Sequence, residues 1–180
     1  AREDIGVARE KAPDTTDTPE MEIRQRGGAA PAVIEQSEWR EARPAATQAL
    51  KELFGHDRFR EGQVEVIERM LDGVDTLAII PTGGGKSLTY QLPSMLLDGV
   101  TLVVSPLIAL MKDQVESAPA PIRDRVSLIN SDIDSEERHR RMAQVREGQI
   151  KLLYVAPERL LDPTLRRSLM AAGLARIVID

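Results

Sequence analysis

Short apolar runs alternate with helical segments along most of this 180-residue chain, and the alternation restricts the fold more than any other feature. The runs are rich in β-branched residues, which favour strands, and each run except the last precedes a stretch with helical spacing. Alternating strands and helices form a parallel sheet with helices on both faces, because each parallel connection crosses over one face. We therefore expect an α/β fold with strands at 76–80, 100–104, 126–129, 152–155 and 177–179.

Capping residues mark where the helices begin and end. Two apolar stripes upstream of the first run stop at Gly55 and Gly73, as helices do when glycine follows their last turn. Asp134 and Glu137 have the spacing of a capping box, and 162–163 combine an aspartate N-cap with a first-turn proline. The sequence therefore predicts two helices before the first strand and further helices after Asp134 and after 162.

The first 37 residues differ in composition from the rest. They contain thirteen charged residues and three prolines but few large apolar ones. Such a segment cannot bury enough apolar surface to offset the entropy lost on ordering. We expect a disordered extension over 1–37 and one folded domain over 38–180.

Charge and cysteine content limit the function classes. The net charge is −5, so any binding of nucleic acid must use local groups rather than an overall basic field. No apolar run approaches the roughly 20 residues of a membrane helix, and the start does not resemble a secretion signal. With no cysteine and two histidines, disulfides and a Cys- or His-based metal site are not expected. A protein of the bacterial cytoplasm, or of the nucleus in a eukaryote, fits better than a secreted or membrane protein.

The segment Pro81-Thr82-Gly83-Gly84-Gly85-Lys86-Ser87 stands where a strand passes into a helix, which is the context of a phosphate-binding loop. Glycines let backbone N–H groups approach phosphates, and the helix N-terminus adds partial positive charge. Lys86 can neutralise the β- and γ-phosphates of ATP, and the Ser87 hydroxyl can ligate Mg²⁺. The general pattern begins with glycine where this chain has Ile80. The alternative, a glycine-rich turn with a surface lysine, does not explain why strand, glycines, Lys-Ser and helix occur together.

Several segments resemble the RecQ family of ATP-dependent DNA helicases, which belongs to helicase superfamily two. The similar segments occur in the family's order and together span about residues 46–180. Thr89 stands where the family more often has cysteine. The segments are 54–63, 82–93, 104–115, 153–160 and 178–180.

This resemblance implies a RecA-like phosphate-loop domain and roles for individual residues. His56, Arg60 and Gln63 would surround the adenine base, and the loop from Thr82 to Ser87 would hold the phosphates. Asp180 would hold Mg²⁺ through water as the first residue of a DEAH motif. Against these roles, the segment around His56 also reads as a plain helix-capping loop.

Two further loops would lie along the path of single-stranded DNA in a RecQ-like helicase. Ser105, Lys112 and Arg159 are the residues that could contact its backbone, although each also reads as an N-cap or a solvated charge. The basic run Arg138-His139-Arg140-Arg141 adjoins two glutamates, and we interpret it as a solvated helix face rather than a DNA site.

The activity implied is ATP-driven movement along single-stranded DNA in the 3′-to-5′ direction, with separation of partially duplex DNA and a role in repair or recombination. The strand at 176–180 reads as a buried strand with nothing after it, so we expect a fragment that lacks the next glutamate and the second motor domain and is inactive alone. Two alternatives remain open: a nucleotide-binding module without catalysis, or another phosphate-loop enzyme, such as a small nucleotide kinase or an RNA-directed helicase. The oligomeric state is not indicated.

Overall fold

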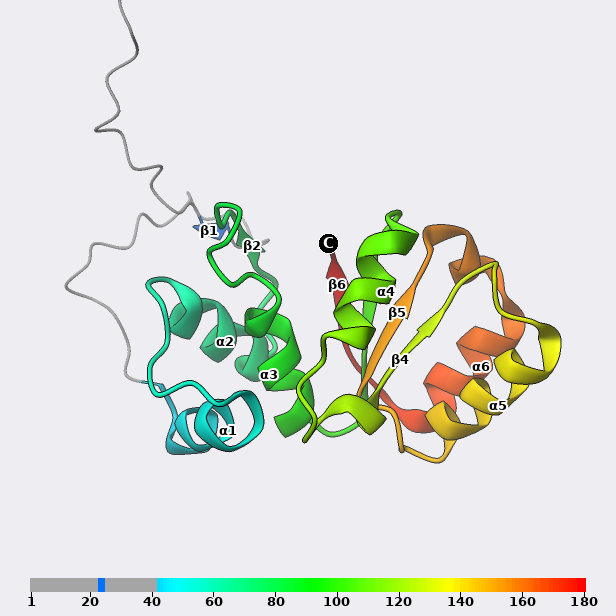
Figure 1. Cartoon of the computed structure of the whole chain (residues 1–180), viewed down its shortest axis with the longest axis horizontal. Helices are drawn as coiled ribbons and strands as arrows, with labels where there is room; N and C mark the ends of the chain where they lie inside the picture. Colours follow the sequence, from blue (N-terminus) through cyan, green and yellow to red (C-terminus); the bar gives the residue numbers. More distant parts are fainter. Residues whose placement is uncertain (1–22, 25–41) are drawn as a thin grey trace, which may run out of the picture.

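A computed structural model describes residues 23–24 and 42–180, and a four-stranded parallel sheet forms its centre (Figure 1). The strands are β3 (Val100–Val104), β4 (Val126–Ile129), β5 (Leu152–Val155) and β6 (Leu174–Ile179). Their spatial order is β4-β5-β3-β6, and every pair is parallel. The expected α/β fold is confirmed. The extension expected over 1–37 lies outside the described residues except for 23–24, and its disorder stays a prediction.

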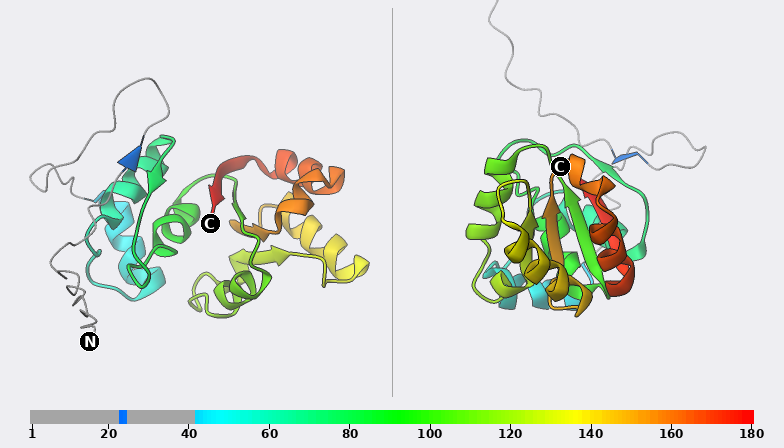
Figure 2. Two further views of the ribbon diagram at one scale, coloured as in Figure 1. Left: turned by 90° about the horizontal axis from the view of Figure 1, so that it is seen from above. Right: turned by 90° about the vertical axis from the view of Figure 1, so that its right-hand side faces the viewer.

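Helices cover both faces of the sheet. One face carries α3 (Leu88–Leu96) and α4 (Ile108–Glu116), and the other carries α5 (Ser135–Arg146) and α6 (Pro163–Ala172). This division follows from the strand order, because right-handed connections that run in opposite directions along a sheet place their helices on opposite faces. Two short 3₁₀ turns, η2 (Arg123–Arg125) and η3 (Pro157–Leu161), complete the connections. Figure 2 shows the sheet between its helical layers.

Side chains from successive strand positions enter two separate cores. In β3, Val103 packs with Met111 of α4, whereas Leu102 and Val104 pack with the helices of the other face. This two-residue period is that of a strand buried on both sides. The expected strands at 100–104, 126–129 and 152–155 therefore agree with the structure at both ends.

A third layer of helices lies outside α3. It consists of α1 (Pro44–Phe54) and α2 (Gln63–Asp72), whose buried residues Leu50 and Ile67 pack with Leu92 of α3. Both helices end at glycines in the left-handed conformation, Gly55 and Gly73, as expected. No helix among the described residues is long and apolar enough to cross a membrane.

The predicted N-caps are present. The Asp134 carboxylate accepts the backbone N–H of Glu137 at 2.8 Å, and Asp162 accepts that of Thr164 at 2.8 Å. These bonds satisfy N–H groups that the first helical turn leaves without partners. They explain why α5 and α6 begin where the sequence predicts.

The first apolar run does not join the central sheet, contrary to the sequence prediction for 76–80. Only β2 (Leu77–Ala78) forms there, and it pairs antiparallel with β1 (Ile23–Arg24). A groove of about 1100 Å³, lined by 74–78 and 174–180, separates β2 from β6. Neighbouring strands must lie about 5 Å apart to form backbone hydrogen bonds. The groove keeps β2 farther than this from β6, so β2 does not join the sheet.

The last strand is also less buried than the sequence indicates. It is the edge strand of the sheet, and Ile177 and Ile179 are 59% and 77% exposed. The end of β6, marked C in Figures 1 and 2, lies on the side of the sheet that faces α1–α3. The expectation of a buried final strand is therefore wrong within the described residues, because no strand covers its outer edge there.

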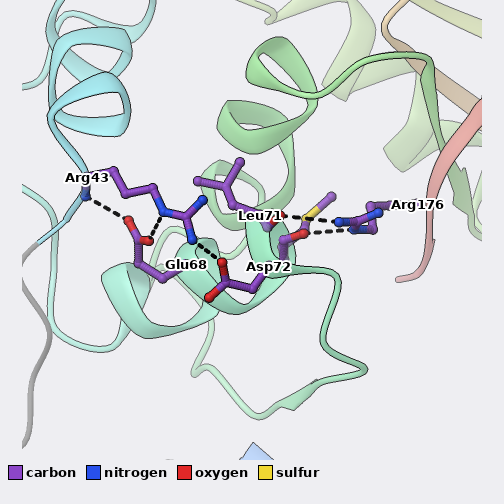
Figure 3. Close-up of polar contacts among 6 residues, drawn as sticks. Arg43, Glu68, Leu71, Asp72 and Arg176 are labelled. Atoms are coloured by element: carbon purple, nitrogen blue, oxygen red, sulfur yellow. Dashed lines mark hydrogen bonds and ion pairs between the residues drawn. The ribbon is translucent and has the colours of Figure 1, made fainter.

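Two arginines connect the outer helices to each other and to the sheet (Figure 3). Arg43 pairs with Glu68 at 2.7 Å and with Asp72, so the start of α1 is tied to α2. Arg176 of β6 donates to the carbonyl oxygens of Met70 at 2.7 Å and Leu71 at 3.3 Å. Carbonyls in the last turn of a helix carry partial negative charge, so the guanidinium stabilises the end of α2 and spans the groove.

Candidate functional site

The segment 81–87, here called the phosphate loop, connects β2 to α3 through a tight turn. The Gly84 N–H donates to the Pro81 carbonyl at 3.0 Å. The N–H groups of Gly83, Gly85, Lys86 and Ser87 donate to no acceptor among the described residues. The loop therefore presents four backbone donors at the start of α3, where the helix dipole also favours an anion. Gly84 was expected to present its N–H to a phosphate, but this N–H closes the turn instead.

Two of the glycines are required by close neighbours. A Cβ atom on Gly84 would lie 2.6 Å from Cγ2 of Ile80, and one on Gly85 would collide with Nε2 of Gln63. Gly85 also has a φ of 78°, a backbone angle that residues other than glycine rarely adopt. Ile80, which replaces the usual first glycine, is thus accommodated because Gly84 leaves room for its side chain.

Gln63 and Arg60 hold the phosphate loop from α2 and the turn before it. The Gln63 side chain is buried, and its Nε2 donates to the carbonyls of Gly85 at 3.0 Å and Gly84 at 3.4 Å. Its Oε1 accepts the Arg60 N–H at 2.8 Å, and the Arg60 guanidinium donates to the Gly83 carbonyl. Both ends of the amide are engaged within the chain. Gln63 therefore supports the loop here, and reading adenine with the same amide would require exchange of these bonds.

Lys86 meets Asp180 beside the phosphate loop. The Lys86 Nζ atom lies 3.7 Å from Asp180 Oδ1, and the two side chains are 55% and 13% exposed. Lys86 is thus loosely paired and open to solvent, while Asp180, at the end of β6, is nearly covered. Two residues that the sequence places 94 positions apart are brought together at one end of the groove.

Ser87 and Asp180 fit a metal ion that is held mainly by phosphates and water. The Tyr90 hydroxyl donates to Asp180 Oδ2 at 3.3 Å. No group of three His, Cys, Asp or Glu side chains suited to a metal occurs among residues 23–24 and 42–180. Mg²⁺ in nucleotide sites uses one or two protein ligands, so this sparse donor set is compatible with it.

The remaining nucleotide candidates are Thr82 and His56. Thr82 is an exposed part of the phosphate loop. His56 follows the end of α1; its backbone N–H donates to the Leu50 carbonyl at 3.2 Å, and its side chain is exposed. The structure thus brings Arg60 and Gln63 onto the loop, whereas the His56 side chain is directed to solvent.

The three candidates for contact with DNA gather at the carboxyl ends of the central strands. We call this region, formed by 105–112, 130–134 and 156–159, the carboxyl edge. The Ser105 hydroxyl is buried and accepts the Leu107 N–H at 3.4 Å. Lys112 pairs with Asp132 at 2.7 Å, and Arg159 donates to the Asn130 carbonyl at 3.2 Å. Lys112 and Arg159 thus both contact the loop at 130–132, and each of the three side chains already has a partner within the protein.

The basic run 138–141 is held by α5 itself. Glu137 pairs with Arg140 and Arg141, each at 2.5 Å, and Arg141 also donates to the Leu128 carbonyl at 2.6 Å. The hydrogen bond from Arg141 lowers the pKa of Glu137 below its usual value. The interpretation as a solvated helix face agrees with the exposed His139 and Arg140, whereas Arg141 is half-buried against β4.

A set of buried polar side chains was not singled out by sequence reasoning. Tyr90 and Gln91 of α3 and Tyr154 of β5 lie inside the apolar core between α3, α4 and the sheet. Burial raises the pKa of both tyrosines. The only sequence signal was an adjacent Tyr-Gln pair in a helix expected to pack on a sheet, which does not by itself distinguish a surface from a core position.

Comparisons with known proteins agree with the geometry. The sequence model of the family described as DEAD/DEAH box helicase matches residues 60–180. An ATP-dependent DNA helicase RecQ from Haemophilus influenzae is 41% identical over 138 residues, covering 77% of this chain and 22% of the relative. The ATP-dependent DNA helicase Q-like 5 of Arabidopsis thaliana is 42% identical over 135 residues, covering 74% and 15%.

A third relative is the ATP-dependent DNA helicase RecQ of a Synechocystis strain, 45% identical over 120 residues, which cover 67% of this chain and 25% of the relative. The chain thus spans a quarter or less of these three relatives.

Proposed function

Because the chain belongs to the DEAD/DEAH box helicase family, we propose that it forms the ATP-binding part of a RecQ-type DNA helicase. In the full-length protein, ATP hydrolysis would drive movement along single-stranded DNA in the 3′-to-5′ direction and separate partially duplex DNA. The proposal rests mainly on one observation: Lys86 and Asp180 meet at 3.7 Å beside a loop with four available N–H groups.

The phosphate loop would bind the triphosphate of ATP by charge and by direct hydrogen bonds. The N–H groups of Gly83, Gly85, Lys86 and Ser87 and the start of α3 favour an anion. Lys86 can leave its loose contact with Asp180 for the β- and γ-phosphates because it is half exposed. Catalysis of phosphoryl transfer consists largely of such positioning and charge stabilisation.

Asp180 and Ser87 would hold Mg²⁺, Asp180 through water and Ser87 through its hydroxyl. When bound, this ion neutralises charge that develops on the phosphate oxygens. The chain itself supplies the Tyr90 hydroxyl, which donates to Asp180 Oδ2 at 3.3 Å. Asp180 is thus oriented before nucleotide arrives.

The adenine base would lie beside Arg60 and Gln63, with His56 stacking from solvent. The proximity of Arg60 and Gln63 to the phosphate loop supports this placement, because base and phosphates of one nucleotide must be reached together. Exchange of the Gln63 amide from the Gly84 and Gly85 carbonyls to the base would couple adenine recognition to the shape of the loop.

Single-stranded DNA would cross the carboxyl edge, with phosphates near Ser105, Lys112 and Arg159. Lys112 provides an exposed ammonium, and Arg159 is held in place through the Asn130 carbonyl. Binding through phosphates releases counterions, so affinity should fall steeply as salt rises. This is how a chain with net charge −5 can bind DNA through local groups.

The decisive variant is Lys86→Ala in the full-length protein. DNA-stimulated ATP hydrolysis should fall by roughly a hundredfold or more, because one positive group at the reacting phosphates is lost. Lys51→Ala, an exposed lysine of α1, serves as the control and should leave the rate unchanged. Near-normal hydrolysis by Lys86→Ala would show that the phosphate loop is not the site of ATP turnover.

The choice between DNA and RNA as the tracked strand is tested separately. DNA is favoured because the relatives are named as DNA helicases. ATP hydrolysis should rise more with single-stranded DNA than with RNA of the same length and sequence. Stronger stimulation by RNA would assign the chain to an RNA-directed enzyme of the same family.

A further inference from the structure

Polar side chains in the core between α3, α4 and the sheet form a connected series of hydrogen bonds and one aromatic ring contact. Tyr90 and Tyr154 are 4% and 1% exposed, and Gln91 is 8% exposed. Their neighbours are apolar and include Met111 and Val103. Burying a polar group costs free energy unless the group is hydrogen-bonded. The hydrogen-bond partners of these side chains therefore help to fix how the core is arranged.

The chain of contacts begins at the nucleotide end. The Tyr90 hydroxyl donates to Asp180 Oδ2 at 3.3 Å. The Tyr90 ring packs edge-on against that of Tyr154, with centroids 6.4 Å apart and an interplanar angle of 71°. Asp180, one of the two proposed magnesium ligands, is therefore bonded to a buried phenol that packs against Tyr154.

The contacts continue to α4 through one amide. Gln91 Nε2 donates to the Tyr154 hydroxyl at 3.2 Å and to Gln114 Oε1 at 3.1 Å. Gln114 is a half-buried residue of α4, two positions beyond Lys112. The helix that carries the candidate phosphate-binding lysine is thus linked to Asp180 at the nucleotide end, through two hydrogen bonds of Gln91, the packing of the two tyrosine rings and the bond from Tyr90.

We propose that Tyr90, Tyr154, Gln91 and Gln114 are positioning residues that couple the nucleotide site to α4. The inference rests on the proposed function, since it assumes ATP at the phosphate loop and DNA at the carboxyl edge. Nucleotide and its metal engage Asp180 and Ser87, which alters the acceptors open to the Tyr90 hydroxyl. The bonds of Tyr154 and Gln91 adjust in turn, and the position of α4, with Lys112, changes.

Such coupling has a measurable form. If nucleotide changes the affinity for single-stranded DNA by some factor, DNA must change the affinity for nucleotide by the same factor. Coupling of this kind typically amounts to roughly 5- to 150-fold. Removing one bond in the middle of the chain of contacts should lower that factor without removing either binding site.

The test uses Gln114→Leu in the full-length protein, because leucine removes the acceptor for Gln91 and keeps the bulk. Anisotropy of a labelled single-stranded oligonucleotide gives its affinity with and without Mg²⁺ and a non-hydrolysable ATP analogue. The ratio of the two affinities should fall at least fivefold toward one, while the affinity without nucleotide and the basal ATP hydrolysis rate stay within about twofold.

Matched variants separate coupling from general damage. Gln114→Glu keeps an acceptor for the Gln91 amide and should restore most of the ratio. Glu116→Gln changes an exposed side chain of the same helix and should leave the ratio unchanged. Tyr154→Phe breaks the other bond of Gln91 and should lower the ratio even if Gln114→Leu fails to fold.

Each outcome decides one proposal. A wild-type ratio that Gln114→Leu and Tyr154→Phe both preserve would overturn the coupling role. A wild-type ratio of one, with normal DNA-stimulated hydrolysis, would also overturn it. Absence of ATP hydrolysis and of DNA binding in the wild type would instead refute the proposed function.

Discussion

The phosphate loop and the carboxyl edge both follow strands and precede helices, yet their polar side chains are arranged differently. At the phosphate loop, Gln63, Arg60 and Asp180 come from separate parts of the chain and converge on one segment. At the carboxyl edge, Lys112 and Arg159 each bond to the neighbouring loop at 130–132. The phosphate loop presents N–H groups that have no acceptor among the described residues. At the carboxyl edge, by contrast, the Lys112 and Arg159 side chains already have acceptors within the protein.

This difference indicates how each region would bind its ligand. The loop N–H groups need no rearrangement to receive phosphates, because the turn already presents them. A DNA phosphate at Lys112 must compete with Asp132, 2.7 Å away. Nucleotide binding should therefore depend on how firmly the loop is supported, and DNA binding on the exchange of ion pairs.

The largest effect is expected when the support of the phosphate loop is removed. Gln63→Leu removes the acceptor of the Arg60 N–H and the amide donor to the Gly85 carbonyl, which then keeps only the Leu88 N–H. Each lost hydrogen bond contributes about 0.5–1.5 kcal/mol to holding the loop, so we expect affinity for ATP to fall roughly tenfold. Titration with a fluorescent ATP analogue measures this change.

Gln48→Leu is the matched control for this prediction, because Gln48 is exposed on α1 and bonds to Glu52. It should leave the affinity for ATP unchanged. Equal affinities for ATP in wild type and Gln63→Leu would mean that the phosphate loop keeps its shape without the Gln63 amide. Nucleotide binding would then not depend on the support of the loop, contrary to the comparison made above.

A smaller effect is expected at the carboxyl edge. Asp132→Asn removes the charge that competes for Lys112, and affinity for single-stranded DNA should rise about two- to fivefold, since exposed ion pairs contribute about 0–1 kcal/mol. Lys112→Ala should lower the affinity and make the slope of log K against log salt shallower by roughly 0.7. Lys51→Ala serves as the control. Weaker binding by Asp132→Asn would show that Lys112 does not meet a phosphate there.

The smallest effect concerns pH. The folded-state pKa of Glu137 is lowered, first by its hydrogen bond with Arg141, which also bonds to β4 beside the carboxyl edge. The pairing therefore stabilises the fold above the ordinary glutamate pKa, and this contribution is lost as pH falls through the lowered value.

Glu137→Gln should accordingly lower the Tm at pH 7 by a small amount, and the difference from wild type should vanish as pH falls below the ordinary glutamate pKa and through the lowered one. Glu136→Gln, an exposed neighbour, should match wild type throughout. A Tm difference that is constant across this range would assign the effect of Glu137→Gln to packing rather than to charge.

Local signals in the sequence predicted most of the fold. Asp134, Asp162, Gly55 and Gly73 mark helix ends through bonds or backbone angles that involve only nearby residues. Strands 100–104, 126–129 and 152–155 are buried on both faces, so their apolar runs are unambiguous. Lys86 and Asp180 were both assigned to the nucleotide site by their positions in resembling motifs, and the structure brings them within 3.7 Å of each other.

Non-local features were not predictable in the same way. The placement of 77–78 beside β1 depends on which strand edge is within reach, which no local pattern records. The contact of Arg176 with the end of α2 joins residues more than 100 positions apart. The engagement of Gln63 with Gly85 likewise changes its expected role, because an amide that can read a base can equally hold a loop.

The most direct test of this account is a crystal structure of the protein with Mg²⁺ and a non-hydrolysable ATP analogue. We predict that the phosphates contact the N–H groups of Gly85, Lys86 and Ser87, with the Lys86 ammonium beside them and Asp180 close to the metal. A nucleotide bound elsewhere, with residues 81–87 in contact with no phosphate, would contradict the assignment on which the proposed helicase function depends.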